Sequence, residues 1–251
     1  MNRLDGKNIL ITGASSGIGK ACALECCKEG ATVHLIARNN DRLEEVARRL
    51  EIDRYSVYAL DVTKSEDIEP IIRQIVDKHG KIDGFIHSAG AQSTQPFRTM
   101  DKNHYIEVFS LNTIAAFDIS RILIKKQYCS QNGISLVFIS SVMSIVGDAG
   151  ITSYCASKAA LVGGTRAMAI ELAPKNIRVN CVSPGTVMGT KMTEGLKSNL
   201  SIDEFRRIVS QYPMGLGQTE DAAKLCVFLL SGDSKWITGQ NLVVDGGYSA
   251  K

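Results

Sequence analysis

Short apolar runs and longer amphipathic segments alternate along the whole chain. The apolar runs have the length and composition of strands that are buried on both faces, and they occupy residues 7–11, 31–37, 56–61, 82–87, 134–139, 178–182 and 241–244. Helical periodicity is found between them, at residues 20–30, 40–50, 101–130, 152–174 and 220–230. This alternation predicts an α/β fold with a doubly wound, mainly parallel sheet, a single-domain Rossmann fold that spans residues 1–251.

Two further segments carry local signals. Thr63 and Glu66 have the spacing of a capping box, which predicts a helix that begins after Thr63 and contains Pro70 near its first turns. Residues 186–213 have weak periodicity, and we expect a mobile flap there. The chain contains no linker, repeat or low-complexity tract that would divide it.

A glycine-rich loop, TGASSGIG, follows the first predicted strand and precedes a helix. Glycines allow a tight turn and a close approach of the backbone to a pyrophosphate, and the N–H groups of a helix N-terminus bind anionic oxygens. A generic turn before a helix would contain similar residues, but the flanking strand and helix favour a dinucleotide site. The expected cofactor contacts in this loop are Gly13, Ser15, Ser16, Gly17, Ile18 and Gly19.

The end of the second predicted strand indicates which dinucleotide binds. An acidic residue about twenty positions beyond the glycine loop would bind the adenosine ribose of NAD. Arg38 and Asn39 stand there instead, and a guanidinium pairs bidentately with a 2′-phosphate. We therefore expect NADP(H), with NAD(H) as the alternative if Arg38 is merely a surface charge.

Other small or polar residues also follow strand ends, where ligands bind to open parallel sheets. They are Asp61, Ser88, Ala89, Gly90, Ser141 and Pro184. Together with the glycine loop and Arg38 they should line one crevice, which favours an enzyme that uses a nucleotide.

Ser141, Tyr154 and Lys158 are the candidates for chemistry in that crevice. In a helix that begins at Thr152, Tyr154 and Lys158 lie four residues apart on one face. A nearby cation favours the phenolate of a tyrosine, whose unperturbed pKa is about 10, and a serine hydroxyl can bond to a substrate oxygen. Solvated helix faces often contain a Tyr-x-x-x-Lys pair, so this prediction depends on the surrounding strand order.

Composition excludes several other classes. The 251 residues are 44% hydrophobic, and the net charge of +3 is too small for a nucleic-acid-binding protein. No run approaches the ~20 apolar residues of a membrane helix, and no signal peptide is visible, so the cytoplasm is the expected compartment. The seven cysteines form no C-x-x-C pair and are expected to be reduced, buried thiols. No metal site is expected.

The motifs, in this order and spacing, resemble the short-chain dehydrogenase/reductase family over nearly the whole chain. The matching segments are TGASSGIG at 12–19, Asp61-Val62, SAG at 88–90, Asn112, Ser141, Tyr154-x-x-x-Lys158, Pro184-Gly185 and ITGQNLVVDGG at 237–247. Two segments depart from the family pattern. His87-Ser88 stands where Asn-Asn is common before Ala-Gly, and Thr190 follows Gly185 by five residues rather than four.

This resemblance implies hydride transfer between a nicotinamide cofactor and a carbonyl or alcohol. It assigns Tyr154 as the general acid or base, Lys158 as the cation that lowers the tyrosine pKa and binds the nicotinamide ribose, and Ser141 as a donor to the substrate oxygen. Asn112 would hold a water in a proton relay. The implied cofactor contacts outside the glycine loop are Arg38, Asn39, Asp61, Val62, Ser88, Ala89, Gly90, Tyr154, Lys158, Pro184, Gly185, Val187 and Thr190.

The resemblance also limits the substrates and partners. A 3-oxoacyl group on acyl carrier protein is one expected substrate, and an NAD-dependent sugar or small-alcohol dehydrogenase is the alternative. A cofactor-binding regulator without activity is disfavoured because Tyr154 and Lys158 are both present. A docking patch for the carrier would consist of Lys191, Lys197, Arg206 and Arg207. A homotetramer is expected, with helix contacts from Ile114, Phe117, Ile119, Ala159, Val162 and Ala169.

The remaining histidines and the tryptophan have mainly structural interpretations. His34 lies within a predicted strand and is expected in the core, and Trp236 is expected in the core or in an interface. His87 is a candidate for a functional role beside the cofactor crevice, although a purely structural role is the stronger expectation.

Overall fold

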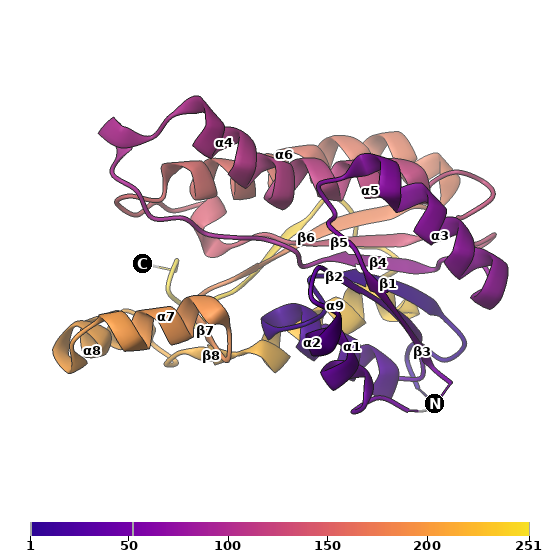
Figure 1. Ribbon diagram of the computed structural model, residues 1–251, viewed down its shortest axis with the longest axis horizontal. Helices are drawn as coiled ribbons and strands as arrows, with labels where there is room; N and C mark the ends of the chain where they lie inside the picture. Colours follow the sequence, from indigo (N-terminus) through magenta and orange to yellow (C-terminus); the bar gives the residue numbers. More distant parts are fainter. Residues whose placement is uncertain (1, 52, 251) are drawn as a thin grey trace.

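A computed structural model describes residues 2–51 and 53–250, without the side chains of residues 196–199. Within these residues, seven parallel strands form one sheet in the order β3-β2-β1-β4-β5-β6-β9 (Figure 1). The strands are β1 (Asn8–Thr12), β2 (Thr32–Ala37), β3 (Tyr55–Ala59), β4 (Gly84–His87), β5 (Ser135–Ile139), β6 (Arg178–Pro184) and β9 (Asn241–Val244). The predicted doubly wound Rossmann fold is confirmed, and the strand order reverses between β1 and β4, where such sheets open a ligand crevice.

Helices cover both faces of the sheet (Figure 1). One face packs against α1 (Gly17–Lys28), α2 (Asn40–Ala47) and α9 (Thr219–Leu230). The other face packs against α3 (Ser65–His79), α5 (Ala115–Leu123) and α6 (Thr152–Leu172). Short 3-10 turns lie at Phe97–Thr99, Val142–Ser144, Ala173–Lys175 and Gly232–Ser234. The strands are apolar throughout because both of their faces are buried.

The single long helix predicted for residues 101–130 is interrupted and shorter. It consists of α4 (Lys102–Phe109), a π-helical turn (Ser110–Ile114) and α5, which ends at Leu123. The apolar pattern continues through the π-turn, so the pattern could not reveal it. Two side chains in the turn hold it in place: Asn112 bonds to the Ala91 backbone, and the Thr113 hydroxyl donates to the Ser157 carbonyl.

The predicted capping box at Thr63 and Glu66 is wrong. Helix α3 begins at Ser65, and its N-cap is Lys64, which makes no side-chain capping bond. The Thr63 hydroxyl and backbone N–H both donate to the Asp61 carboxylate instead. The acidic residue at the end of β3 therefore competes successfully for the group that would have capped the helix.

Residues 186–213 contain regular structure that their weak periodicity did not predict. They form β7 (Val187–Met188), which pairs with β8 (Gly217–Gln218), and then α7 (Lys191–Asn199) and α8 (Ile202–Ser210). Figure 1 shows these two helices as an arm that extends beyond the end of the sheet. Helix α8 has an apolar stripe of Ile202, Phe205, Ile208 and Val209, but none of its side chains, all of which are described, is buried, so this stripe does not pack into the core.

His34 and Trp236 differ in burial. His34 is completely buried, as expected, whereas Trp236 is 96% exposed and cannot be a core residue. All seven cysteines are free thiols, and they are buried except for the half-buried Cys129 and Cys155. No helix in the described part of the chain has the length and hydrophobicity needed to span a membrane.

Candidate active site

A cavity of about 500 Å³ opens at the carboxyl ends of the strands. Every residue predicted to bind cofactor or to act chemically lines this cavity, except Gly19 and Asn112. The lining includes Gly13, Ser15, Ser16, Gly17, Ile18, Arg38, Asn39, Asp61, Val62, Ser88, Ala89, Gly90, Ser141, Tyr154, Lys158, Pro184, Gly185, Val187 and Thr190. Residues far apart in the sequence thus meet in one crevice because parallel strands present their carboxyl ends at one edge.

The glycine loop is shaped by close backbone contacts. A Cβ on Gly13, which has φ +67°, would lie 2.7 Å from the Ser88 carbonyl oxygen and the Ala89 nitrogen. A Cβ on Gly19 would overlap the Gly13 carbonyl, so Gly19 supports the loop from behind and does not line the cavity. Ser16 precedes the first residue of α1 and makes no capping bond of its own. The N-terminus of α1 and a free serine hydroxyl therefore face the cavity, as an anion site requires.

Basic side chains mark the end of the crevice beyond β2. Arg38 and Arg42 both line it, and the Asn39 side chain caps α2 by accepting the Arg42 backbone N–H at 2.9 Å. Asp61 faces them from the end of β3. Hydrogen bonds from Thr63 hold the pKa of the Asp61 carboxyl below its ordinary value.

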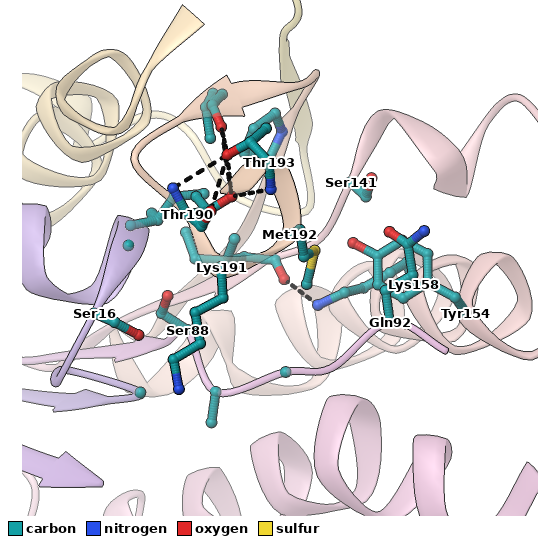
Figure 2. Close-up of a pocket in the computed structure, with 18 of the residues that line it drawn as sticks. Ser16, Ser88, Gln92, Ser141, Tyr154, Lys158, Thr190, Lys191, Met192 and Thr193 are labelled. Atoms are coloured by element: carbon teal, nitrogen blue, oxygen red, sulfur yellow. Dashed lines mark hydrogen bonds between the residues drawn. The ribbon is translucent and has the colours of Figure 1, made fainter. Parts of the chain in front are cut away.

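Tyr154 and Lys158 project from α6 beside Ser141, which follows strand β5 and caps the 3-10 turn Val142–Ser144 (Figure 2). The Lys158 Nζ lies 5.7 Å from the centre of the Tyr154 ring and donates a 2.8 Å hydrogen bond to the Ile139 carbonyl. Burial raises the pKa of Tyr154, and a hydrogen bond with Ser141 opposes this only in part. Burial lowers the pKa of Lys158 to about 8. The phenol therefore keeps its proton at neutral pH, and the expected lowering of its pKa by Lys158 is not seen in this arrangement.

Asn112 lies behind the crevice, on the π-turn. Its Oδ1 accepts the Ala91 N–H at 2.9 Å, and its Nδ2 donates to the Ala91 carbonyl and to Ser157 Oγ at 3.0 and 2.9 Å. A Cβ on Gly90 would lie 3.2 Å from both Asn112 Oδ1 and Lys158 Nζ. A side chain at position 90 would therefore press against both Asn112 and Lys158.

Comparisons with known proteins agree with this geometry. A family model described as "Enoyl-(Acyl carrier protein) reductase" matches residues 13–249. The 3-oxoacyl-[acyl-carrier-protein] reductase FabG of Thermotoga maritima is 37% identical over 248 residues, 98% of each chain. The chain belongs to the short-chain dehydrogenase/reductase family.

Other relatives of this short-chain dehydrogenase/reductase differ in their activities. FabG of Haemophilus influenzae is 34% identical over 245 residues, 97% of this chain and 98% of the relative. An NAD-dependent glycerol dehydrogenase of Listeria innocua is 33% identical over 246 residues, 98% and 94% of the two chains. The protein is accordingly an NAD(P)-dependent oxidoreductase.

Thr190, the residue displaced by one position from the family pattern, still reaches the crevice of this dehydrogenase/reductase. Gly189, the residue before it, adopts φ +79°. Thr190 Cγ2 would lie 3.4 Å from a Cβ on Gly17, so Thr190 faces the glycine loop across the cavity. Its hydroxyl is bonded to that of Thr193 at 2.8 Å. Figure 2 shows Lys191, the next residue, pointing into the same space.

The substrate end of the crevice contains residues that the sequence did not single out. Tyr212 and Tyr248 stack with their ring centres 4.8 Å apart, and the Tyr212 hydroxyl bonds to Thr186. The other lining residues at this end are Gln92, Met143, Asp148, Ile151, Met192, Ile208 and Gln211. They come from separate loops and from the α7–α8 arm, so no motif or spacing connects them.

Proposed function

We propose that the protein reduces the carbonyl of a 3-oxoacyl thioester on acyl carrier protein, with NADPH as the hydride donor. The observation that carries this proposal is that Ser141, Tyr154 and Lys158 line the same cavity as Gly13, Ser16 and Gly17 of the glycine loop. The relatives in T. maritima and H. influenzae, both named as 3-oxoacyl-[acyl-carrier-protein] reductases, support the substrate class.

The residues of the crevice supply position and a proton. When bound, the cofactor supplies the hydride. As negative charge develops on the substrate oxygen, Ser141 donates a hydrogen bond to it and Tyr154 gives up its proton. A tyrosine whose pKa is raised by burial keeps that proton at neutral pH, which suits the reductive direction. Lys158 holds a positive charge close to the ring and stabilises the phenolate that remains.

Asn112 and Lys158 then provide a path for the replacement proton. Both side chains border the space next to Gly90, and a water held there would connect Lys158 with the interior of the protein. Asn112 is suited to fix such a path because three hydrogen bonds fix its amide.

Arg38 and Arg42 support NADPH rather than NADH. Both side chains line the end of the crevice beyond β2, and the chain has no acidic residue at the positions directly after that strand. A ribose 2′-phosphate there would meet guanidinium groups, whereas a free 2′-hydroxyl would meet no carboxylate.

The basic residues expected to dock the carrier lie on the α7–α8 arm. Arg206 pairs with Asp203 at 3.4 Å and Arg207 is exposed, while the side chain of Lys197 lies outside the described residues. Lys191 stands at the crevice itself. These cations support docking of an acidic carrier close to the substrate end.

A second candidate function is the oxidation of a small polyol. The L. innocua relative is named as a glycerol dehydrogenase, and Gln92, Asp148 and Gln211 give the substrate end polar groups that could bond to hydroxyls. Reduction of an acyl thioester and oxidation of a polyol would use different parts of the same cavity. An acyl chain requires the apolar groups, whereas a polyol requires the polar ones.

One panel of assays tests both candidate functions. Oxidation of NADPH and NADH is followed with a 3-oxoacyl thioester, keto-sugars and dihydroxyacetone, and the reverse reaction is followed with glycerol. The proposal expects the highest kcat/KM for the thioester with NADPH. A preference for glycerol and NAD would contradict the proposed thioester reduction and support the second candidate function.

We also propose a homotetramer. Ile106 and Ile114 on the α4 and π-turn segment are more than half exposed, as is Ile170 on α6. Ile119, Val162 and Ala169, which were expected to join such contacts, are buried within the chain itself and cannot do so. Sedimentation at micromolar concentration tests the proposal, and a monomer there contradicts it.

A further inference from the structure

His87 ends strand β4 directly beneath the crevice, but it does not line the cavity. The side chain has no exposed surface. Its Nδ1 lies 3.0 Å from the Thr12 hydroxyl, and its Nε2 lies 3.1 Å from the Leu111 carbonyl oxygen. One imidazole therefore joins the end of β1, next to the glycine loop, to the π-turn that carries Asn112.

The directions of these hydrogen bonds follow from one fixed acceptor. A carbonyl oxygen can only accept, so Nε2 of His87 carries the proton and donates to Leu111. Burial, together with the nearby Lys158 charge, lowers the pKa of His87 to about 3, so the ring is neutral and its Nδ1 accepts from the Thr12 hydroxyl. The Thr12 oxygen in turn accepts the Ala89 N–H at 3.4 Å.

These bonds connect three segments that form the crevice. Ala89 belongs to the turn after β4, Thr12 precedes Gly13, and Leu111 precedes Asn112. Within the π-turn, Asn112 and Thr113 are held through their side chains, and His87 bonds to the backbone at Leu111. π-Turns are rare and occur frequently at functional sites.

We propose that His87 is a positioning residue, which holds the carbonyl of Leu111 and thereby sets the place of Asn112 relative to Lys158. The catalytic part of this inference rests on the proposed function, because Asn112 matters to turnover only if the proton path is used. The positioning itself does not depend on the identity of the substrate.

Three substitutions separate the two bonds of the ring. Glutamine places its amide nitrogen close to the position of Nε2 and can still donate to Leu111. Asparagine reaches only as far as Nδ1, so it keeps a partner for Thr12 and loses Leu111. Leucine loses both. We expect His87→Leu and His87→Asn to lower kcat roughly 10-fold, because small misplacements of catalytic groups have effects of this size. The Kd for NADPH should stay unchanged in both variants. His87→Gln should keep kcat within about twofold of the wild-type value.

His34→Leu is the matched control. His34 is a buried strand histidine that bonds to Ser56 and Asn8, away from the crevice. All variants are compared at a temperature where circular dichroism shows them folded. If His34→Leu lowers kcat as much as His87→Leu, or if His87→Leu keeps the wild-type kcat, the proposal is overturned.

Hydrogen exchange at the Ala91 amide gives a readout that needs no turnover. Asn112 Oδ1 accepts this N–H, so the amide should exchange faster in His87→Leu than in His34→Leu. Equal exchange in the two variants contradicts the positioning. If the wild-type protein reduces no carbonyl in the panel, the proposed function fails, and the exchange result still decides the role of His87.

Discussion

Burial on α6 raises the pKa of Tyr154 above that of a tyrosine in water, and the hydrogen bond with Ser141 offsets this only in part. Its environment, and not its spacing to Lys158 alone, suits it to donate a proton. The sequence identified the pair but could not give its pKa, which depends on burial by residues from other elements.

Replacing Tyr154 by phenylalanine removes the proton and keeps the ring. We expect kcat to fall about 10²-fold or more, while the Kd for NADPH, measured by its fluorescence, stays within about twofold because the glycine loop and Arg38 are unchanged. Tyr128→Phe is the control, since Tyr128 is buried far from the crevice and donates to Glu69. Wild-type turnover in Tyr154→Phe contradicts the assignment.

The expected preference for NADPH over NADH depends on Arg38. For Arg38→Ala we expect KM for NADPH to rise about 10-fold or more, since a charge-assisted hydrogen bond contributes ~1.5–3 kcal/mol. KM for NADH should change little. Arg3→Ala, which removes an exposed arginine near Asp233, is the control. Equal changes for both cofactors would show that Arg38 does not contact a 2′-phosphate.

The substrate end of the crevice shows the limit of residue-by-residue prediction. The cofactor residues follow strand ends and could be found from the order of strands. Tyr212 and Tyr248 meet only because the segment before β8 and the C-terminal segment return to the same place. Neither has a periodic or motif signal, so their contact depends on tertiary structure alone.

Strands and core helices were predictable because they bury apolar surface, whereas helix ends and the arm were not. Strand β5 coincides with the predicted run to within one residue, because both its faces are buried. Thr63 does not cap α3, because its hydroxyl donates a hydrogen bond to Asp61. The π-turn escaped notice because apolar residues continue through positions 110–114 without a glycine or proline to mark it.

Helix α8 depends on its cap more than a core helix does. Ser201 and Glu204 form a capping box, and no side chain of α8, which is fully described, is buried. For Ser201→Ala we expect a loss of about 1 kcal/mol in the local stability of α8, seen as faster amide exchange in α8 with an unchanged melting temperature. Ser210→Ala, at the other end of the helix, is the control.

If Ser201→Ala lowers the melting temperature of the whole protein, α8 unfolds together with the sheet and is not an independent arm. Unchanged exchange in α8 would mean that the cap contributes nothing there.

Buried histidines make the whole molecule sensitive to acid. Burial lowers the pKa of His34 and of His87 to about 3, compared with about 6.5 when unfolded. The unfolded state therefore binds more protons below pH 6.5, and the free energy of unfolding falls as the pH decreases from about 6.5 toward 3, by roughly 5 kcal/mol for each histidine. Above pH 6.5 this contribution is fully present.

Urea unfolding from pH 7 to pH 5 measures this effect. His34→Gln should weaken the pH dependence by up to ~1.4 kcal/mol per pH unit below pH 6.5, because one proton-binding difference is removed. Parallel curves for the wild type and the variant would show that His34 is not buried in its neutral form.

The packing of α9 on α1 has a consequence for the order of synthesis. The two helices share one apolar cluster, and Lys7 Nζ donates to the Leu230 carbonyl at 2.7 Å. The packing around α1 is therefore complete only when a segment more than two hundred residues later in the sequence has been made. Until residue 230 leaves the ribosome, the outer face of α1 has no cover. The apolar surface of α1 that α9 covers therefore stays exposed in the nascent chain until α9 is made, and a chaperone could shield it during that time.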